Sequence, residues 1–528
     1  MAAAGIRHLA SAERDPEMRR SLRSDHAKCE TCVATAPNFE TGRGFYASKS
    51  SMRTPLLLLT MAAGLMPTLF SAHAAESRPN ILFIAIDDLN HWVGYTGRNP
   101  QARTPNIDRL SRMGVSFTHA YCAAPLCNPA RAALMSGKRP GTSACYQNSE
   151  FWKNYISEGL GLTATLKKAG YYVAGCGKIY HNSSYYTSEW DDYGKEQGVG
   201  GDEDEEADSG NRKKKGGSNL KGGPIMKMEG FQQPVKHDLQ DSDLSDWHIV
   251  SYCTNQLARR HDKPFFLACG LHKPHLPWVV PRKYYDLFPV NSIQLPPYQE
   301  DDLKDIPAVG LKMAKPNGDH AQILASGRWK EAIQSYLACI AYTDMNVGRL
   351  LDALQKSPYA SNTIICFWGD HGWHLGEKHH WRKFTLWEEA ARAPMIWVVP
   401  GMTRAGVLCE RTVDFMSIYP TLCELTGTAI PQHVEGVSMR KLLADPTAAW
   451  TTAGITTFGF MNHTVRTEEY RYIRYSDGGE EFYNEKTDPY EWDNRASSGD
   501  FDRQKAELRK LMPAENAPPR KAGGKQKP

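Results

Sequence analysis

Short apolar runs alternate with longer amphipathic stretches between residue 80 and about residue 400. The run at 80–86 is bounded by turn residues and ends in an acidic pair, as a strand buried on both faces would. Similar runs stand at 172–174, 264–270, 363–368 and 395–399. In the stretches 104–113 and 329–356, apolar residues recur at spacings of three and four, which predicts helices. This alternation predicts an α/β fold with a large, mainly parallel sheet flanked by helices.

The pattern changes after about residue 430. Residues 455–494 have the composition of short strands joined by turns, which predicts a smaller α+β subdomain over 431–512 behind a main, catalytic domain over 76–430. Pro, Gly and Lys are frequent from residue 513 onward, and we expect a disordered tail over 513–528. An acidic run and then a basic run among glycines at 198–223 indicate a solvated surface insertion, with polyanion binding as the alternative.

The N-terminal region contains a targeting signal. A basic start at Arg53, an apolar run over 56–70 and small residues around Ala74 are typical of a secretory signal peptide over 52–74. The run is shorter than the about 20 residues of a membrane span, which makes an N-terminal anchor the weaker alternative. We interpret 1–51 as a non-native or disordered leader, with translation starting at Met52. The sequence thus predicts an exported protein, periplasmic or secreted, without a stable membrane span after cleavage.

Composition excludes some functions. The chain has 528 residues, of which 41% are hydrophobic and 23% charged, as in an ordinary globular protein, and its net charge of +4 gives no reason to expect a nucleic-acid partner. Cys29 and Cys32 form a CxxC pair that no second pair follows, so we do not expect a zinc site there. Cys269 and Cys366 fall in strand-like runs and are expected to be buried small hydrophobes.

Two pairs of polar residues follow predicted strands. Asp87-Asp88 follows the run at 80–86, and Asp370-His371 follows the run at 363–368. The carboxyl ends of parallel strands meet at one edge of a sheet, where ligands bind, so the four side chains can converge on one divalent cation. An Asp-Asp pair that only caps a helix is the alternative interpretation.

The most specific motif begins at Cys127. The segment from Cys127 to Arg131 reads Cys-Asn-Pro-Ala-Arg and has the frame C-x-P-x-R, with Ser136-Gly137 after it. In this frame the chain resembles the type I sulfatase family of the alkaline-phosphatase-like superfamily, whose cysteine is converted to formylglycine by a formylglycine-generating enzyme. Ala130 stands where many family members have Ser.

The resemblance implies a cofactor and a maturation partner. Cys127, as formylglycine, would join Asp87, Asp88, Asp370 and His371 as a ligand of one Ca²⁺ ion, and the generating enzyme would be the partner. A thiol would form a stable adduct with sulfate, whereas an aldehyde hydrate has one hydroxyl to attack sulfur and another to expel the sulfate. Arg131 has a guanidinium fork suited to holding the hydrate and the nearby carboxylates.

Further motifs supply candidate catalytic residues. Lys178 and His181 follow a strand-like run, and their K-x-x-H spacing resembles the iduronate-2-sulfatase branch of the family. The resemblance makes His272, in His-Lys-Pro-His, the proton donor to the leaving alcohol, and Lys383 a bridge between sulfate and leaving oxygen. Lys178 would neutralise a sulfate oxygen, and His181 would take a proton as sulfate leaves. The alternative interpretation of His272 is a loop histidine whose hydrogen bonds are made within the protein. The alternative for Lys383 is a residue of a solvated charged loop.

The candidate substrate contacts are basic or aromatic, because an aromatic face packs on a sugar ring and a cation pairs with a carboxylate or sulfate. They are His275, His380, Trp381, Arg382 and His463. The sequence thus predicts a sulfuric ester hydrolase acting on a sulfated carbohydrate. The rivals are a phosphatase or phosphonate monoester hydrolase on the same fold, and a catalytically inactive carbohydrate-binding protein.

Overall fold

A computed structural model describes residues 78–200 and 239–520. Eight strands form the main sheet, in the order β10-β2-β9-β6-β1-β5-β3-β4. They are β1 (Asn80–Ile86), β2 (Val115–Tyr121), β3 (Tyr172–Gly177), β4 (Asp192–Gly194), β5 (Phe265–Leu271), β6 (Thr363–Gly369), β9 (Met395–Val398) and β10 (Val407–Asp414). The leader, the signal peptide, the CxxC pair and most of the charged insertion lie outside the described residues.

The sheet is mainly parallel, which confirms the predicted fold class. β1 lies in parallel register between β5 and β6, with Ile86 opposite both Leu271 and Gly369. β9, however, runs antiparallel to both β2 and β6. The apolar pattern of β9 cannot show this direction, because a strand buried on both faces has the same pattern whichever way it runs. The central strands therefore end together at one edge of the sheet.

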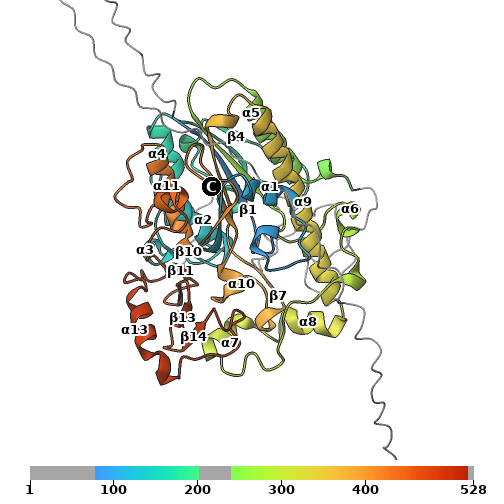
Figure 1. The fold of residues 1–528 in the computed structure, drawn as a ribbon, viewed down its shortest axis with the longest axis vertical. Coiled ribbons are helices and arrows are strands. Elements are labelled where there is room, and N and C mark those ends of the chain that lie inside the picture. The colour runs from blue at the N-terminus through green and yellow to red at the C-terminus, as the bar shows by residue number, and fades with distance from the viewer. Residues whose placement is uncertain (1–77, 201–238, 521–528) are drawn as a thin grey trace, which may run out of the picture. The chain divides into compact units, whose positions relative to one another are not determined.

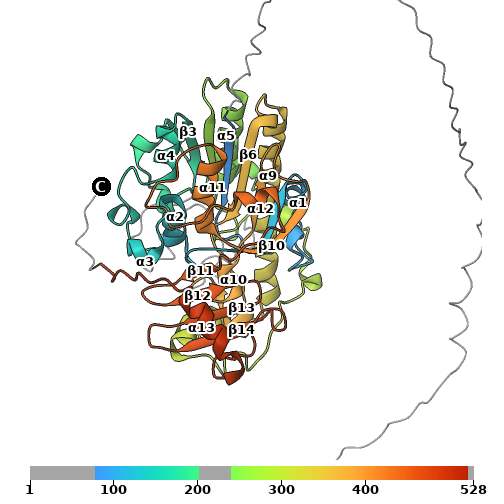
Figure 2. The same cartoon turned by 60° about the vertical axis from the view of Figure 1, so that its left-hand side comes forward.

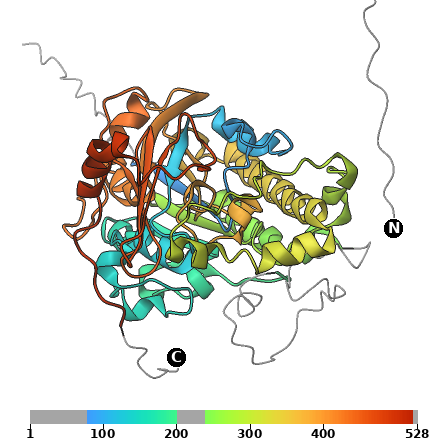
Figure 3. The same ribbon diagram turned by 90° about the horizontal axis from the view of Figure 1, so that it is seen from below.

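Helices cover both faces of this sheet, because the strands have apolar side chains on both faces (Figures 1 and 2). One face packs against α1 (Pro105–Ser111), α5 (Ser245–Ala258) and α9 (Trp329–Lys356). The other packs against α2 (Cys127–Ser136), α4 (Leu162–Lys168), α11 (Ile418–Leu425) and α12 (Arg440–Ala444). From below, the long yellow helix α9 lies apart from the cyan segment that carries α2 (Figure 3). α9 spans the predicted helix 329–356, and α1 lies within the predicted 104–113.

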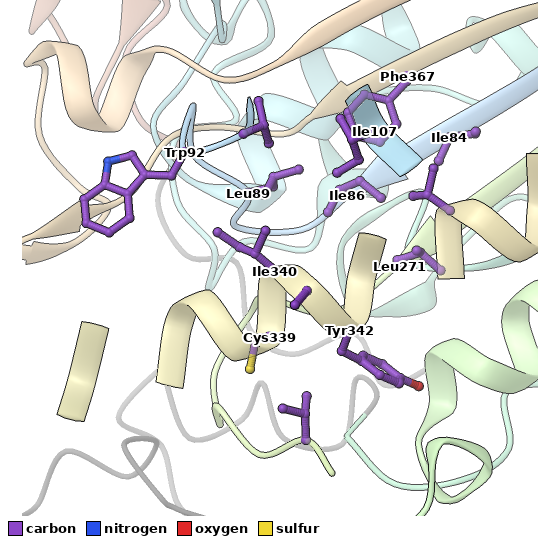
Figure 4. Close-up of a cluster of buried hydrophobic side chains, with 14 of the residues drawn as sticks. Ile84, Ile86, Leu89, Trp92, Ile107, Leu271, Cys339, Ile340, Tyr342 and Phe367 are labelled. Atoms are coloured by element: carbon purple, nitrogen blue, oxygen red, sulfur yellow. The ribbon is translucent and has the colours of Figure 1, made fainter. Parts of the chain in front are cut away.

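Alternate residues of β1 belong to different cores. Ile81, Phe83 and Ala85 pack on the α2 side of the sheet. Leu82, Ile84 and Ile86 pack on the α9 side, as do Leu271 of β5 and Ile340 of α9 (Figure 4). All of these side chains are inaccessible or nearly so, and the burial of each one larger than alanine contributes about 1.5–3 kcal/mol. The sheet is therefore a rigid base for whatever stands at its edge.

The C-terminal part forms a second, antiparallel sheet. Its strands are β11 (Gly454–Thr457), β12 (His463–Arg466), β13 (Tyr470–Arg474) and β14 (Glu480–Asn484), and α13 (Asp502–Lys510) follows them. The sheet lies beside α7 (Ala308–Ala314) and α10 (Glu388–Ala391) in Figures 1 and 2. Trp387, Ile473 and Tyr483 share one apolar cluster with Ile306 of the segment before α7. This part confirms the predicted smaller α+β region.

A group of buried ion pairs joins this sheet to the main domain. Arg471 Nε lies 3.1 Å from Glu485 and 2.5 Å from Glu491, and a second nitrogen of Arg471 pairs with Glu388. Arg466 Nε lies 3.2 Å from the same oxygen of Glu485. We call these residues the arginine cluster: Arg466, Arg471, Glu388, Glu485 and Glu491. Because Glu388 begins α10, the cluster fixes the C-terminal sheet to the main domain.

The chain after α13 returns to the main domain. Ala517 N donates to Gly141 O at 2.7 Å, and Ala517 O accepts from the hydroxyl of Tyr146 at 2.7 Å. These bonds give the backbone of Ala517 partners in the main domain, and the bounds predicted for the tail stay a prediction. Among the described residues, no helix is both long and apolar enough to span a bilayer.

Candidate active site

The two polar pairs predicted at strand ends lie side by side. Asp87 and Asp88 follow β1, and Asp370 and His371 follow the neighbouring strand β6. Asp88 N donates to Asp370 Oδ1 at 3.0 Å, and Asp88 adopts a left-handed conformation with φ of 57°. The hydroxyl of Tyr336, from α9, donates to Asp88 O at 2.8 Å and holds this turn. A non-glycine residue in this conformation is uncommon and needs such support.

Cys127 is the first residue of α2 and is fully buried against these strand ends. Its Sγ lies 3.0 Å from Lys383 Nζ, 3.2 Å from His371 Nε2 and 3.8 Å from Asp88 Oδ1. The N-terminus of a helix adds partial positive charge at this position. Burial nevertheless raises the pKa of the Cys127 thiol well above its usual value, so the thiol is neutral at physiological pH.

Arg131 and Lys178 fix the carboxylates. Arg131, one turn along α2, donates from Nε to Asp370 Oδ2 at 2.9 Å and from Nη2 to Asp87 Oδ1 at 3.3 Å. Lys178 Nζ donates to Asp87 Oδ2 at 2.7 Å. Lys383 Nζ donates to Asp88 Oδ1 at 2.8 Å. We call the residues of this site the active-site cluster: Asp87, Asp88, Cys127, Arg131, Lys178, Asp370, His371 and Lys383.

A glycine lets Lys178 reach the cluster. Gly177 ends β3 with φ of 80°, and a Cβ atom there would lie 2.1 Å from Gly270 O. Only glycine avoids both the left-handed strain and this clash. The chain can therefore turn sharply at Gly177 and direct Lys178 inward.

The donor set fits a divalent cation. Ligand atoms of Asp87, Cys127, Asp370 and His371 all lie within 4.8 Å of one another, and a second such group is Asp87, Asp88, Cys127 and His275. Asp88 Oδ2 is buried without a hydrogen-bond partner, and burial raises the pKa of Asp88 to about 8. A bound cation would satisfy this oxygen and stabilise the carboxylate. Carboxylate oxygens are the donors that Ca²⁺ prefers.

His371 can offer a lone pair to the same cation. Burial lowers the pKa of His371 to about 4, so the ring is neutral near pH 7. Its Nδ1 lies 2.9 Å from Gly372 O, which assigns the proton to Nδ1 as the donor of that bond. Nε2 is then unprotonated and lies 3.2 Å from Cys127 Sγ. A carbonyl partner on the far nitrogen is the usual way in which a metal-binding histidine is oriented.

The structure separates the two histidines of the His-Lys-Pro-His motif. His272 Nε2 lies 2.9 Å from Glu196, and its backbone N–H donates to the buried Asp246 at 2.7 Å. His275 instead points into the cluster, with Nε2 3.7 Å from Asp88 Oδ2. Burial lowers the pKa of His275 well below its usual value. His275, predicted only as a substrate contact, is thus grouped with Asp87, Asp88 and Cys127, whereas the contacts of the expected proton donor His272 are with Glu196 and Asp246.

His181 lies close to Lys178. The side chain is almost fully buried, and its pKa is lowered well below the usual range, first by burial and then by the positive charge of Lys178. A neutral imidazole in this position can accept a proton.

The other predicted substrate contacts are held by the protein itself. The two ring nitrogens of His380 lie 2.7 Å from Ala314 O and 2.6 Å from Lys383 O. Trp381 is buried and donates to His320 at 3.2 Å. Arg382 pairs with Asp319 at 2.7 Å. His463 lies between Thr457 and Asn516, 2.9 and 2.8 Å away.

A cavity of about 830 Å³ adjoins this loop. His380, Trp381 and Arg382 line it, whereas His463 is not among its lining residues. Further lining residues come from the α7 segment, from α8 (Asp319–Ser326) and from turns of the C-terminal sheet, and they include Lys312, Lys315, Phe458 and Asn462. The sequence analysis did not select Lys312 or Lys315. Nothing in the local sequence distinguishes them from other surface lysines.

The mainly parallel sheet, flanked by helices and followed by a small antiparallel sheet, is the fold of the alkaline-phosphatase-like class. Within that class, the model of the Sulfatase family matches residues 79–428, and the chain belongs to this family. A second model, described as N-sulphoglucosamine sulphohydrolase, C-terminal, matches residues 376–517.

Three relatives illustrate the similarity. A sulfatase of Formosa agariphila is 39% identical over 473 residues, which cover 83% of this chain and 87% of that protein. Iduronate 2-sulfatase of Mus musculus is 28% identical over 400 residues, covering 68% and 70%. The solved structure of phosphonate monoester hydrolase from Agrobacterium radiobacter has a TM-score of 0.67 and 19% identity, covering 82% of this chain and 94% of that one. At that identity the last similarity concerns the fold alone.

Proposed function

We propose that this sulfatase removes O-sulfate from a sulfated carbohydrate, with a formylglycine at position 127 and one Ca²⁺ ion. The observation that carries the proposal is the position of Cys127 Sγ, 3.0 Å from Lys383 Nζ and 3.2 Å from His371 Nε2, between two strand ends that carry three aspartates. The Sγ atom stands where an oxygen of the formylglycine hydrate would be.

The thiol itself is poorly suited to the reaction. It is neutral because burial raises its pKa, although Lys383 and the helix N-terminus both favour the thiolate. The formylglycine hydrate supplies a hydroxyl that attacks sulfur and a second hydroxyl whose deprotonation expels the sulfate. A formylglycine-generating enzyme would act before folding completes, because Cys127 is inaccessible in the folded chain.

The surrounding residues have separate roles in this proposal. Lys178 and Lys383 stabilise the negative charge that develops on the sulfate oxygens, and Arg131 holds Asp87 and Asp370 in place. The geometry favours His275 over His272 as the proton donor to the leaving oxygen, because His275 lies beside Asp88. His181 accepts the proton that is released as sulfate leaves.

Asp87, Asp88, Asp370, His371 and residue 127 would hold the cation. When bound, the ion supplies positive charge that polarises sulfate oxygens and lowers the pKa of a coordinated hydroxyl. Calcium fits the three carboxylates better than a softer metal would.

The substrate class follows from the relatives and from the loop 380–384. Iduronate 2-sulfatase, by name, acts on a sugar acid, and the K-x-x-H spacing of Lys178 and His181 supports that branch. We propose a sulfated polysaccharide fragment or a glycosaminoglycan-like sugar, met outside the cytoplasm if residues 52–74 direct export.

Mass spectrometry of the tryptic peptide that contains position 127 tests this proposal, after co-expression with a formylglycine-generating enzyme. A loss of about 18 Da, as a thiol becomes an aldehyde, is expected for an activated nucleophile of this kind. An unmodified cysteine in protein that nevertheless turns over would overturn the proposed nucleophile.

The similarity in fold to a phosphonate monoester hydrolase is the reason to test one alternative reaction, the hydrolysis of a phosphate or phosphonate ester. Rates on matched aryl sulfate and aryl phosphate separate the two, and we expect the sulfate to react faster. Sugar binding without turnover, after confirmed aldehyde formation, would instead favour a catalytically inactive carbohydrate-binding protein.

A further inference from the structure

The cavity beside the active-site cluster has an excess of positive charge. Its charged lining residues are Lys312, Lys315, Arg382 and Asp319. Arg382 and Asp319 neutralise one another at 2.7 Å. Within 78–200 and 239–520, neither lysine is assigned an ion pair or hydrogen bond from its ammonium group, and both side chains are exposed. Among the described residues, the cavity therefore has two lysines without a paired carboxylate.

One wall of the cavity is aromatic. The rings of Phe384 and Phe458 have centroids 6.2 Å apart and an interplanar angle of 38°. Both pack on a small cluster that contains Leu126, the residue before Cys127. Aromatic rings and cations that line one cavity suit a sugar ring that carries an anionic group, since the ring has an apolar face as well as charged substituents.

The cavity is also in the right place to receive a neighbouring sugar. Phe384 lines it, and the preceding residue, Lys383, reaches Cys127 with Nζ at 3.0 Å from Sγ. The loop that carries Lys383 to Cys127 therefore also forms part of the cavity wall. Phe384 N donates to Pro125 O at 3.1 Å, which fixes the wall to the segment before the nucleophile.

We propose that this cavity is a subsite for a second anionic group, a carboxylate or sulfate, on the sugar next to the one that loses its sulfate. Lys312 and Lys315 of the α7 segment would recognise that group. The inference rests on the proposed function, because it assumes that the sulfate ester belongs to an oligosaccharide. It makes Lys312 and Lys315 specificity-determining residues.

Three matched sulfated disaccharides test the subsite. They differ only in the neighbouring sugar, which carries a carboxylate, a second sulfate, or, after carboxyl reduction, no charge. We expect kcat/KM of the native enzyme to be about 10-fold higher on a charged substrate than on the neutral one, as two partly exposed cation contacts allow. The preference should shrink as salt concentration rises. Whichever charged substrate is preferred identifies the anion.

Lys312→Gln and Lys315→Gln, made together, should bring the ratio of charged to neutral substrate close to one. Their rate on the neutral disaccharide and on an aryl sulfate should stay unchanged, because neither lysine touches the active-site cluster. Lys330→Gln is the matched control, an exposed lysine outside the cavity lining. It should keep the native ratio.

Equal kcat/KM of the native enzyme on all three disaccharides would overturn the subsite while leaving the sulfatase reaction intact. A preference that survives in the double variant would also overturn it. Absence of turnover on every sulfate ester, the aryl sulfate included, would instead overturn the proposed function, so the two failures are distinguishable.

Discussion

The active-site cluster and the arginine cluster are both buried groups of ion pairs, but they differ in whether the chain supplies partners for the charged atoms. In the arginine cluster each guanidinium meets carboxylates of the same chain, and Arg471 also donates to Leu386 O at 3.1 Å and to Thr464 at 3.0 Å. In the active-site cluster, Asp88 Oδ2 has no hydrogen-bond partner among the described residues. His275 Nε2 lies 3.7 Å from this oxygen, and Cys127 Sγ lies 3.8 Å from the other carboxylate oxygen, Oδ1.

This difference shows that a buried charged residue can serve either stability or function, depending on whether the chain supplies its partner. A buried charge that the chain pairs internally holds elements together, and removing one partner leaves the other uncompensated. A buried carboxylate oxygen that the chain leaves without a hydrogen bond, such as Asp88 Oδ2, is poised for a ligand. Changes in the active-site cluster should therefore lower activity more than stability, and changes in the arginine cluster should do the reverse.

The largest effect is expected at Cys127, the proposed nucleophile. Cys127→Ala should lower kcat by about 10⁴-fold or more, because no other group can form the covalent intermediate. Its free energy of unfolding, measured by urea denaturation, should change by about 1 kcal/mol or less. Cys122→Ala, at a buried cysteine that precedes α2, is the matched control and should keep turnover within a few-fold. Comparable turnover by the two variants would contradict the assignment.

The arginine cluster should give the converse result. Arg471→Met leaves Glu388, Glu485 and Glu491 buried without their main partner and should lower the free energy of unfolding by about 3–5 kcal/mol. Protein that remains folded should keep its kcat. Arg474→Met, on the exposed end of the same strand, should change stability by about 0.5 kcal/mol or less. An inactive but fully stable Arg471 variant would reverse the comparison.

Removal of the metal tests whether the active-site cluster binds Ca²⁺. If Ca²⁺ at 100 times its dissociation constant stabilises the native chain, a calcium chelator should lower the free energy of unfolding by about 2.7 kcal/mol and abolish turnover. Added Ca²⁺ should restore both. Asp88→Asn should weaken this response, because one carboxylate ligand is lost. A thermal midpoint that is the same with and without chelator would count against a bound ion.

The smallest effect is expected at His463. Burial lowers the pKa of His463 from 6.5 to about 4, so between these pH values the unfolded chain binds a proton that the native chain does not. The free energy of unfolding should therefore fall as the pH falls through this window, by roughly 1–2 kcal/mol between pH 7 and pH 5. Above the window the contribution of the neutral His463 ring to stability should be complete. His463→Gln should flatten that slope in urea denaturation. An unchanged slope would show that other groups determine it.

The sequence was most informative where one short segment carries the whole signal. The apolar runs predicted β1, β3, β5 and β6, because burial on both faces leaves no polar position in a strand. Edge strand β10 is half exposed and gave no such run. The C-x-P-x-R frame and the acidic strand ends needed no partner elsewhere in the chain to be recognised.

Long-range contacts could not be predicted in the same way. His272 and His275 are three residues apart and equally plausible from the sequence, but only the fold directs His275 toward Asp88 and gives His272 to Glu196. Trp381 was predicted to pack on a sugar ring, but its side chain is buried and donates a hydrogen bond to His320.

By itself, then, the sequence determined the class of fold and which residues stand at the strand ends and at the start of α2, because each depends on the local order of residues. The roles of these residues as metal ligands and nucleophile stay predictions. Only the tertiary structure decided which side chains meet: the choice between the histidines, the lysines of the cavity and the arginine cluster. These contacts join segments far apart in the chain, as Lys383 joins Cys127 and Arg471 joins Glu388. Their partners are set by how the sheet and its helices pack.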